Sequence, residues 1–236
     1  MEGFVDLHCH ILPGVDDGAK DMADALALID MALADGTTAM VLTPHYRGRF
    51  RQNTPQMLQT VFMELRQRAP DRMALYLANE VGYERELTDK LADGRVLTVN
   101  GSRYVLLELP VDATAEKVQC AVREVADQTF VPILAHVERY DAFLRNKFLI
   151  DRVLDMGALI QINADSVMGE QGFAAKRFCH WLLKSRRAHF VASDSHDLHQ
   201  RPPKLGCCFA YIEKKYGEEY AAALFRDNAR VVLAGE

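Results

Sequence analysis

Short apolar runs alternate with longer amphipathic stretches along most of the chain. The runs are a few residues long and rich in Val, Ile, Leu and Ala, which is typical of strands buried in a parallel sheet. We predict seven such strands, at Phe4–Leu7, Ala39–Thr43, Leu75–Asn79, Tyr104–Leu109, Val131–Ala135, Leu159–Ile162 and His189–Ala192.

The stretches between these runs carry apolar residues at helical spacing. Asp21–Ala34 is followed by Gly36, which suits the end of a helix, and Thr54–Arg68 begins with an N-cap Thr and Pro55. Further helices are predicted at Ala115–Gln128, Phe148–Met156, Ala174–Lys184, Leu205–Tyr216 and Glu218–Asn228. Strand and helix repeated in this way indicate βαβ units of a parallel sheet.

Nothing in the sequence marks a domain boundary. It contains no Pro-, Gly- and Ser-rich linker, no internal repeat and no low-complexity segment. A single α/β barrel commonly takes about 200–250 residues, and the chain has 236. We therefore expect one domain, residues 1–236, that forms a closed or nearly closed (β/α)7 barrel.

Charge and cysteine content narrow the class of protein. The formal net charge of −5 argues against nucleic-acid binding, which usually leaves a basic footprint. No apolar run reaches the roughly 18 residues of a membrane span, and the N-terminus lacks the features of a signal peptide. The five cysteines show no framework spacing, which suggests a reducing compartment. We expect a cytoplasmic protein without membrane insertion.

Imidazoles and carboxylates stand at the carboxyl ends of six of the seven predicted strands. They are His8 and His10, His45, Glu80, Glu108, His136, and Asp194 with His196. In α/β barrels these strand ends face a common mouth, where active sites are built. One histidine at a strand end is more often structural, but recurrence at six ends predicts a shared metal site. Mixed imidazole and carboxylate ligands suit Zn, Mn or Fe better than Ca or Mg alone.

Spacing within the first motif supports this interpretation. His8 and His10 are two residues apart on a strand, so their side chains point to the same face. Asp194 and His196 have the same spacing. Cys9 should point to the opposite face, as a small core residue.

The loop after the first strand holds two adjacent acids. Asp16 and Asp17 precede Gly18. For Asp16 we favour a role in the turn and as N-cap of the following helix. Asp17 could reach the metals from this loop.

Arginines accompany the predicted ligands. Arg139 follows His136 and Arg201 follows His196, each by a few residues. Because a guanidinium binds phosphate oxygens as a planar fork, we predict that both bind phosphate rather than serve as surface residues or ion pairs. A basic run of Arg47, Arg49 and Arg51 lies after His45. Such a run is usually a solvated face, but here it could rim the mouth, and we expect Arg47 to contact an anionic substrate.

These motifs, in this order, resemble those of the polymerase-and-histidinol-phosphatase (PHP) family. They are H-C-H, T-P-H at Thr43–His45, Glu80, Glu108, H-V-E-R-Y and D-S-H, and the match spans essentially the whole chain. Within the family the chain is most similar to bacterial manganese-dependent protein tyrosine phosphatases of capsule and exopolysaccharide operons. That similarity lies in H-C-H-I-L-P-G-V-D-D-G-A-K-D, T-P-H-Y, N-E-V, L-L-E-L-P, A-H-V-E-R-Y and S-D-S-H…R-P-P.

The resemblance implies a distorted, TIM-like seven-stranded barrel and three divalent metal ions, with Mn favoured over Fe or Zn. It also implies a ligand set for each metal. The first would take His8, His10, Glu80 and Asp194; the second would share Glu80 and take Glu108 and His136; the third would take Asp17, His45 and His196. Arg139 and Arg201 match the phosphate-binding arginines of the family.

The implied reaction is hydrolysis of phosphotyrosine in a protein, by resemblance the C-terminal tail of a bacterial tyrosine kinase that controls capsular or exopolysaccharide synthesis. We expect an activated water to attack phosphorus while Arg139 and Arg201 neutralise the developing charge. Asp194, His196 or a nearby water would protonate the leaving phenolate.

Other chemistries fit the sequence less well. Cysteine-based tyrosine phosphatases require C-x5-R, but the residues six places beyond the five cysteines are Val15, Ala126, Ser185, Glu213 and Lys214. A PHP phosphatase acting on a small phosphomonoester such as histidinol phosphate stays open as an alternative. The net charge counts against a nuclease-like PHP module. The complete ligand set counts against a non-catalytic protein.

Overall fold

Parallel strands form the centre of the fold in the computed structural model, which describes residues 3–84 and 86–235. One sheet has the order β1-β2-β4, and a second has the order β3-β5-β6-β7-β8-β9. The strands are β1 (Phe4–Cys9), β2 (Thr37–Leu42), β3 (His45–Tyr46), β4 (Ala74–Leu77), β5 (Glu80–Gly82), β6 (Tyr104–Glu108), β7 (Val131–Leu134), β8 (Leu159–Asn163) and β9 (Phe190–Ala192). All neighbouring strands pair in parallel.

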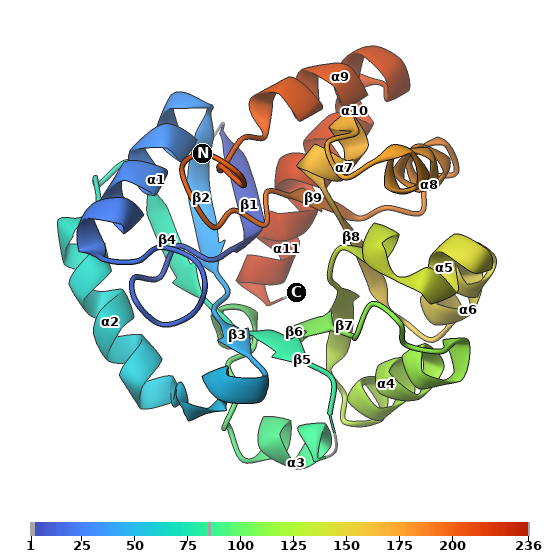
Figure 1. Ribbon diagram of the computed structural model, residues 1–236, viewed down its shortest axis with the longest axis horizontal. Coiled ribbons are helices and arrows are strands. Elements are labelled where there is room, and N and C mark those ends of the chain that lie inside the picture. Colours follow the sequence, from blue (N-terminus) through green and yellow to red (C-terminus); the bar gives the residue numbers. More distant parts are fainter. Residues whose placement is uncertain (1–2, 85, 236) are drawn as a thin grey trace.

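The two sheets are consecutive parts of one curled wall (Figure 1). β2 leads into β3 and β4 leads into β5, so the β2–β4 pairing continues as the β3–β5 pairing. On the other side, a parallel bridge between Cys9 and Ser195 joins β1 to the segment after β9. The strands therefore follow one another around a ring. The predicted α/β class with a distorted seven-stranded barrel is confirmed, with two of the seven strands each broken into two.

The breaks lie where the backbone leaves the regular ladder. Pro44, between β2 and β3, has no N–H to donate to a neighbouring strand. Asn79, between β4 and β5, donates its side-chain amide to the Pro44 carbonyl at 2.9 Å and accepts from the Leu97 N–H at 2.9 Å. β2 and β4 correspond to the predicted strands Ala39–Thr43 and Leu75–Asn79, whereas the short strands β3 and β5 beyond the breaks were not predicted. One consequence matters for the site: His45 on β3 pairs directly with Glu80 on β5.

Helices cover the outside of the ring (Figure 1). Six agree with the predicted ranges to within one residue at each end: α1 (Met22–Ala34), α2 (Pro55–Arg68), α4 (Ala115–Asp127), α6 (Leu149–Asp155), α8 (Phe173–Lys184) and α9 (Gly206–Tyr216). Asp21 and Thr54 cap α1 and α2, and the side chain of each accepts a backbone N–H of the first turn. These local signals explain why the boundaries could be predicted.

Several short elements were not predicted. They are α3 (Leu87–Ala92), α5 (Asp141–Arg145), α7 (Ala164–Met168) and the 3₁₀ turns Gly48–Gln52, Val99–Gly101 and Val137–Arg139. The last predicted helix, Glu218–Asn228, is longer than expected, because α10 (Glu218–Ala222) continues through a π-helical turn into α11 (Asn228–Ala234). Within the described residues, no helix is both long and apolar enough to cross a membrane.

The interior of the ring is apolar at one end only. Val5, Leu7 and Ile133 on the strands pack with Ala229 and Val232 of α11 in one buried cluster. Figure 1 shows α11 at the centre of the ring. Because this helix and the apolar side chains fill the amino-terminal end of the barrel, the polar side chains are left to the carboxyl ends of the strands.

Candidate metal centre

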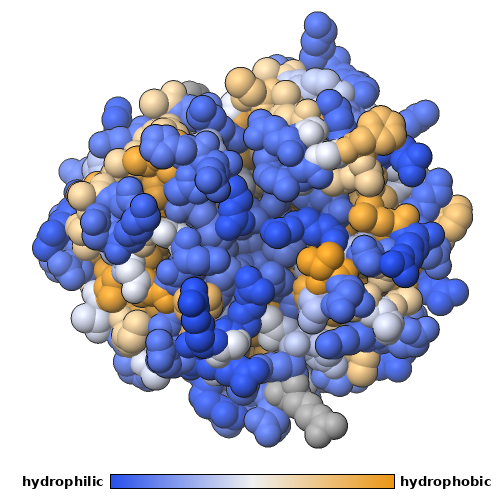
Figure 2. Space-filling view, viewed as in Figure 1, coloured by the Kyte–Doolittle hydropathy of each residue, from blue (hydrophilic) through white to orange (hydrophobic). Residues whose placement is uncertain are grey.

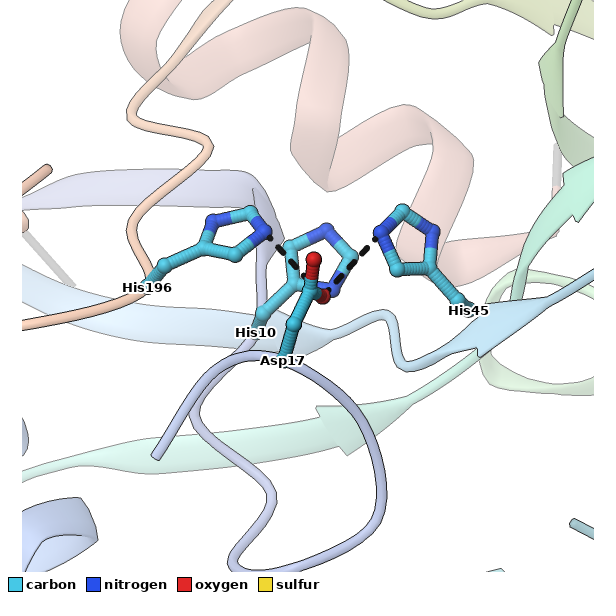
Figure 3. Close-up of side chains that lie close together, drawn as sticks. All are labelled: His10, Asp17, His45 and His196. Atoms are coloured by element: carbon cyan, nitrogen blue, oxygen red, sulfur yellow. Dashed lines mark ion pairs between the residues drawn. The ribbon is translucent and has the colours of Figure 1, made fainter. Parts of the chain in front are cut away.

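The nine predicted ligands all lie close together at the carboxyl ends of the strands. Their ligand atoms form four groups, each within 4.8 Å: His8, His10 and Asp194; His8, Glu80 and His136; His45, Glu80 and Glu108; and His10, Asp17, His45 and His196. Figure 3 shows the last group, with Asp17 between the rings of His45 and His196. Figure 2 shows hydrophilic residues gathered over the centre of the face viewed in Figure 1. The structure thus brings together the residues that the strand-end pattern singled out, whereas their roles as ligands stay predictions.

Glu80 lies at the centre of the cluster and is fully buried. Its Oε1 is 2.8 Å from His136 Nε2. Its Oε2 is 2.8 Å from His45 Nδ1, 3.3 Å from His10 Nε2 and 3.5 Å from His8 Nε2. Within the described residues, this oxygen nevertheless accepts no well-directed hydrogen bond. A buried carboxylate oxygen that several imidazole nitrogens approach without hydrogen bonding fits a ligand shared between metal ions.

The orientation of the His8 and His10 imidazoles also supports a bound metal ion. His10 Nδ1 is 2.7 Å from Asp16 Oδ2, and His8 Nδ1 is 3.1 Å from Gln161 Oε1. Both partners are acceptors, so both Nδ1 atoms carry the proton and, in neutral rings, both Nε2 atoms carry a lone pair. These two Nε2 atoms lie only 3.2 Å apart. Facing lone pairs repel, and a cation that both can bind removes the repulsion.

Asp16 has a different role from the one predicted. The N-cap of α1 is Asp21, so the prediction that Asp16 caps the helix is wrong. Its buried carboxylate accepts from the backbone N–H of Gly18 and of His45, both at 3.0 Å, as well as from His10. The bond to Gly18 shapes the turn, as expected. The bond to His10 fixes which nitrogen of that ring faces the cluster.

Asp17 reaches the cluster from the same loop. Its side chain is 42% exposed, and Oδ1 lies 3.3 Å from His45 Nε2 and 3.6 Å from His196 Nε2. The loop can take this path because Gly18 has no side chain. A Cβ at Gly18 would overlap the carbonyl oxygen of His10 and lie 2.6 Å from the His10 Cβ.

We expect Gly18→Ala to lower the free energy of unfolding by about 1–3 kcal/mol, the usual cost of overpacking a close contact. The loop must move to relieve the overlap, so Asp17 should also leave the cluster and metal binding should weaken. Urea unfolding with and without Mn²⁺ measures both effects. Wild-type stability in this variant would contradict the close approach of Gly18 to His10.

The carboxylates of the cluster have strongly perturbed pKa values. Burial alone would raise the pKa of Glu80, but His8 and His10 beside it outweigh burial and hold the pKa well below its usual range. The pKa of Asp194 is likewise lowered, because the neighbouring imidazoles, His8 first, outweigh its burial. For Glu108, burial and the charge of Glu80 both raise the pKa.

The pKa values of the imidazoles in the cluster also shift in opposite directions. Burial lowers the pKa of His45, but Asp17 and Glu80 outweigh it and raise the pKa to about 9. Burial and the charge of His10 lower the pKa of His196 to about 3. Such divergence within one buried cluster is typical of a functional site. It also means that the ionised carboxylates need a positive partner, which divalent metal ions would supply.

Two arginines meet at Asp194. Arg139 and Arg201 each place one terminal nitrogen 3.4 Å from Asp194 Oδ2. Their side chains keep 42% and 32% of their surface exposed. Both guanidinium groups therefore border the cluster and still face the solvent at the mouth of the barrel.

Arg47 borders the cluster from the other side. Its Nε is 3.0 Å from Glu108 Oε2, and its side chain is 48% exposed. It lines a pocket of about 320 Å³ together with Glu108, His136 and Arg139. Gly82 makes room for it, because a Cβ there would lie 2.7 Å from the Arg47 Cβ. Farther out, Arg51 pairs with Glu84, which also contacts Lys90.

Comparison with known proteins decides the family. The family described as "Capsular polysaccharide synthesis, CpsB/CapC" matches residues 4–234. The chain belongs to the CpsB/CapC family.

Relatives with assigned activities match the CpsB/CapC chain over nearly its full length. Tyrosine-protein phosphatase CpsB of Streptococcus pneumoniae is 30% identical over 98% of both chains. The putative tyrosine-protein phosphatase CapC of Staphylococcus aureus is 32% identical over 99% of this chain and 92% of its own. The crystal structures of YwqE from Bacillus subtilis and CpsB from Streptococcus pneumoniae, unique metal-dependent tyrosine phosphatases, include a chain that matches with a TM-score of 0.91 and 29% identity. That match covers 98% of this chain and 95% of the other. The resemblance drawn from the motifs is confirmed.

The sequence prediction for this CpsB/CapC chain missed two buried amides. Gln161 and Asn163 lie at the carboxyl end of β8, and the Gln161 side chain contacts His8 while that of Asn163 contacts Asp194. One signal could have found them: β8 corresponds to the one predicted strand without an imidazole or carboxylate at its end. Amides at that position were easy to overlook, because they seldom bind metals directly.

Proposed function

We propose that this chain is a metal-dependent protein tyrosine phosphatase. The observation that carries the proposal is the position of Arg139 and Arg201, which meet at Asp194 on the edge of a buried cluster of imidazoles and carboxylates. A phosphate group at that edge would face two guanidinium groups and the cluster at the same time. The tyrosine phosphatase activity assigned to relatives across the length of the chain supports the choice of phosphotyrosine.

We infer that the cluster binds three divalent metal ions, with Mn²⁺ favoured and Fe or Zn as alternatives. The proposed ligands are His8, His10, Glu80 and Asp194 for the first ion, Glu80, Glu108 and His136 for the second, and Asp17, His45 and His196 for the third. The lone pairs that face each other between His8 and His10 support the first site. When bound, such metals polarise phosphoryl oxygens and lower the pKa of a water molecule.

The side chains around the cluster bind and orient the phosphate. Arg139 and Arg201 donate to the phosphoryl oxygens and neutralise the charge that develops on them in the transition state. Asp194 holds both arginines in place through Oδ2. A ligating Asp194 carboxylate has no proton to give, and the remaining N–H of a ligating His196 points to the backbone carbonyl of Asp194, 2.8 Å away. We therefore favour water as the proton source. The tyrosine leaving group, with a pKa of about 10, needs little acid assistance.

The proposed substrate is a phosphotyrosine in a protein segment, such as the C-terminal tail of a bacterial tyrosine kinase that controls capsular or exopolysaccharide synthesis. The three arginines at the mouth keep between 32% and 48% of their side chains exposed, which suits a substrate attached to a larger molecule. All five cysteines are free, which supports a cytoplasmic location.

A substrate panel tests the proposed function. We expect the purified chain, with Mn²⁺, to hydrolyse a phosphotyrosine peptide much faster than the matching phosphoserine peptide or histidinol phosphate. The physical reason is the aryl leaving group together with the open, arginine-lined mouth. Release of phosphate, followed with and without Mn²⁺, gives the comparison. Faster turnover of histidinol phosphate would replace the proposal by a small-molecule phosphatase.

A further inference from the structure

β8 lies between two strands that are each followed by a predicted metal ligand. Its neighbours are β7, which His136 follows, and β9, which Asp194 follows shortly after. The side chains of Gln161 and Asn163 are two residues apart on β8, so they point to the same face. Both residues are almost completely buried, at 0% and 3% exposure. A buried amide must have its hydrogen bonds satisfied, and the partners of these two are informative.

The direction of each hydrogen bond in this group is determined. The backbone N–H of His136 can only donate, so the Gln161 atom 2.9 Å away must be the oxygen. The Gln161 nitrogen then donates to the Asn163 oxygen at 2.8 Å, and the Asn163 nitrogen donates to Asp194 Oδ2 at 2.9 Å. The ionised Asp194 carboxylate can only accept. The fixed donor is the His136 N–H and the fixed acceptor is the Asp194 carboxylate. Only one orientation of each amide satisfies both, so both amides are held in that orientation.

This chain of bonds sets the tautomer of His8. The same Gln161 oxygen lies 3.1 Å from His8 Nδ1, so that nitrogen must carry the proton. The lone pair of His8 is then on Nε2, which lies 3.5 Å from both Glu80 Oε2 and Asp194 Oδ1. Gln161 thus presents the metal-binding nitrogen of His8 to the cluster.

The same chain of hydrogen bonds gives the two carboxylate oxygens of Asp194 different partners. Oδ2 accepts from Asn163 and contacts Arg139 and Arg201. Oδ1 faces the cluster, at 3.5 Å from the Nε2 atoms of both His8 and His10. Without the amide of Asn163, the carboxylate would be free to rotate and present both oxygens to the arginines.

We propose that Gln161 and Asn163 are positioning residues of the metal centre. They are not ligands. Through one directed chain of hydrogen bonds they hold the side chains of His8 and Asp194 in their metal-facing orientations and fix the backbone of His136. The backbone N–H of Asn163 donates to Glu138 at 2.9 Å, which ties the chain to the turn that carries Arg139. This inference rests on the proposed metal centre and adds to it the residues that determine its geometry.

Near-isosteric substitutions test the inference by metal binding rather than by activity. We expect Gln161→Met and Asn163→Leu to lower the affinity for Mn²⁺ about 10- to 100-fold, the usual effect of losing a hydrogen bond behind a metal ligand. Both should also change the visible absorption of the Co²⁺-substituted protein. Gln161→Glu keeps the acceptor for His8 and the His136 N–H, so it should retain more affinity than Gln161→Met. A merely structural role predicts the opposite order, because a carboxylate is costlier to bury than a thioether.

Asn228→Leu is the matched control. Its amide donates to the His189 carbonyl, at the other end of β9, and the variant should lose stability without a change in metal affinity. If Gln161→Met does not fold, Asn163→Leu and Gln161→Glu still decide the question. Folded variants with the affinity and Co²⁺ spectrum of the wild type overturn the inference. If the wild type binds Mn²⁺ but does not hydrolyse phosphotyrosine, the proposed function is wrong and the inference is not. If the wild type binds no metal, both are wrong.

Discussion

Removal of metal is expected to abolish the phosphatase activity of the purified chain. We expect a loss of about a thousandfold or more, which corresponds to about 4 kcal/mol of transition-state stabilisation. The reason is that the protein residues at the mouth can bind phosphate but cannot activate water. The described residues at the centre of the cluster are imidazoles and carboxylates that face one another, and the lowered pKa of Glu80 makes it a weak base for taking a proton from water.

The measurement is turnover of a phosphotyrosine peptide before and after treatment with EDTA, and again after addition of Mn²⁺, Fe²⁺ or Zn²⁺. EDTA saturated with Mn²⁺ beforehand is the control for effects of the chelator itself. Recovery with one of these ions and its stoichiometry would establish which metal the site prefers and how many it holds. Full activity in a sample shown by elemental analysis to be free of metal would refute the proposed chemistry.

The strand-end pattern predicted the location of the site because barrel geometry is simple. In a parallel barrel the carboxyl ends of all strands meet at one mouth, so position along the strand is enough to bring His8, Glu80 and His136 together. No knowledge of loop structure is needed for these residues. Asp17 was harder, because it reaches the cluster from a loop whose path depends on the close approach of Gly18 to His10.

The sequence could not distinguish the roles of adjacent residues of the same type. Asp16 and Asp17 are chemically identical and adjacent, and only the fold shows that one supports His10 while the other faces His45 and His196. The short strands β3 and β5 were missed for a related reason. The predicted strands end at Thr43 and Asn79, and the local structure beyond them depends on a bond between Asn79 and the Pro44 carbonyl, which are far apart along the chain.

Substitution by lysine of either arginine proposed to bind phosphate should have the second large effect. We expect Arg139→Lys and Arg201→Lys each to lower kcat/KM by about 10²–10³, the usual cost of removing one donor to a transition-state oxyanion. Lysine keeps the positive charge but loses the planar fork that binds two phosphoryl oxygens. It also loses the contact with Asp194 Oδ2 that holds each guanidinium group at the edge of the cluster.

Arg145→Lys is the matched control, because Arg145 is 81% exposed on α5 and pairs only with Asp141 in the described part of the chain. Inhibition by inorganic phosphate gives a second measurement. If the arginine binds phosphate, its replacement should weaken inhibition by this product. If the substitutions lower kcat but leave phosphate inhibition and KM unchanged, the arginines stabilise only the transition state. If they leave kcat/KM at the value of Arg145→Lys, their exposed positions beside Asp194 are structural, and the phosphate must be bound by the metals alone.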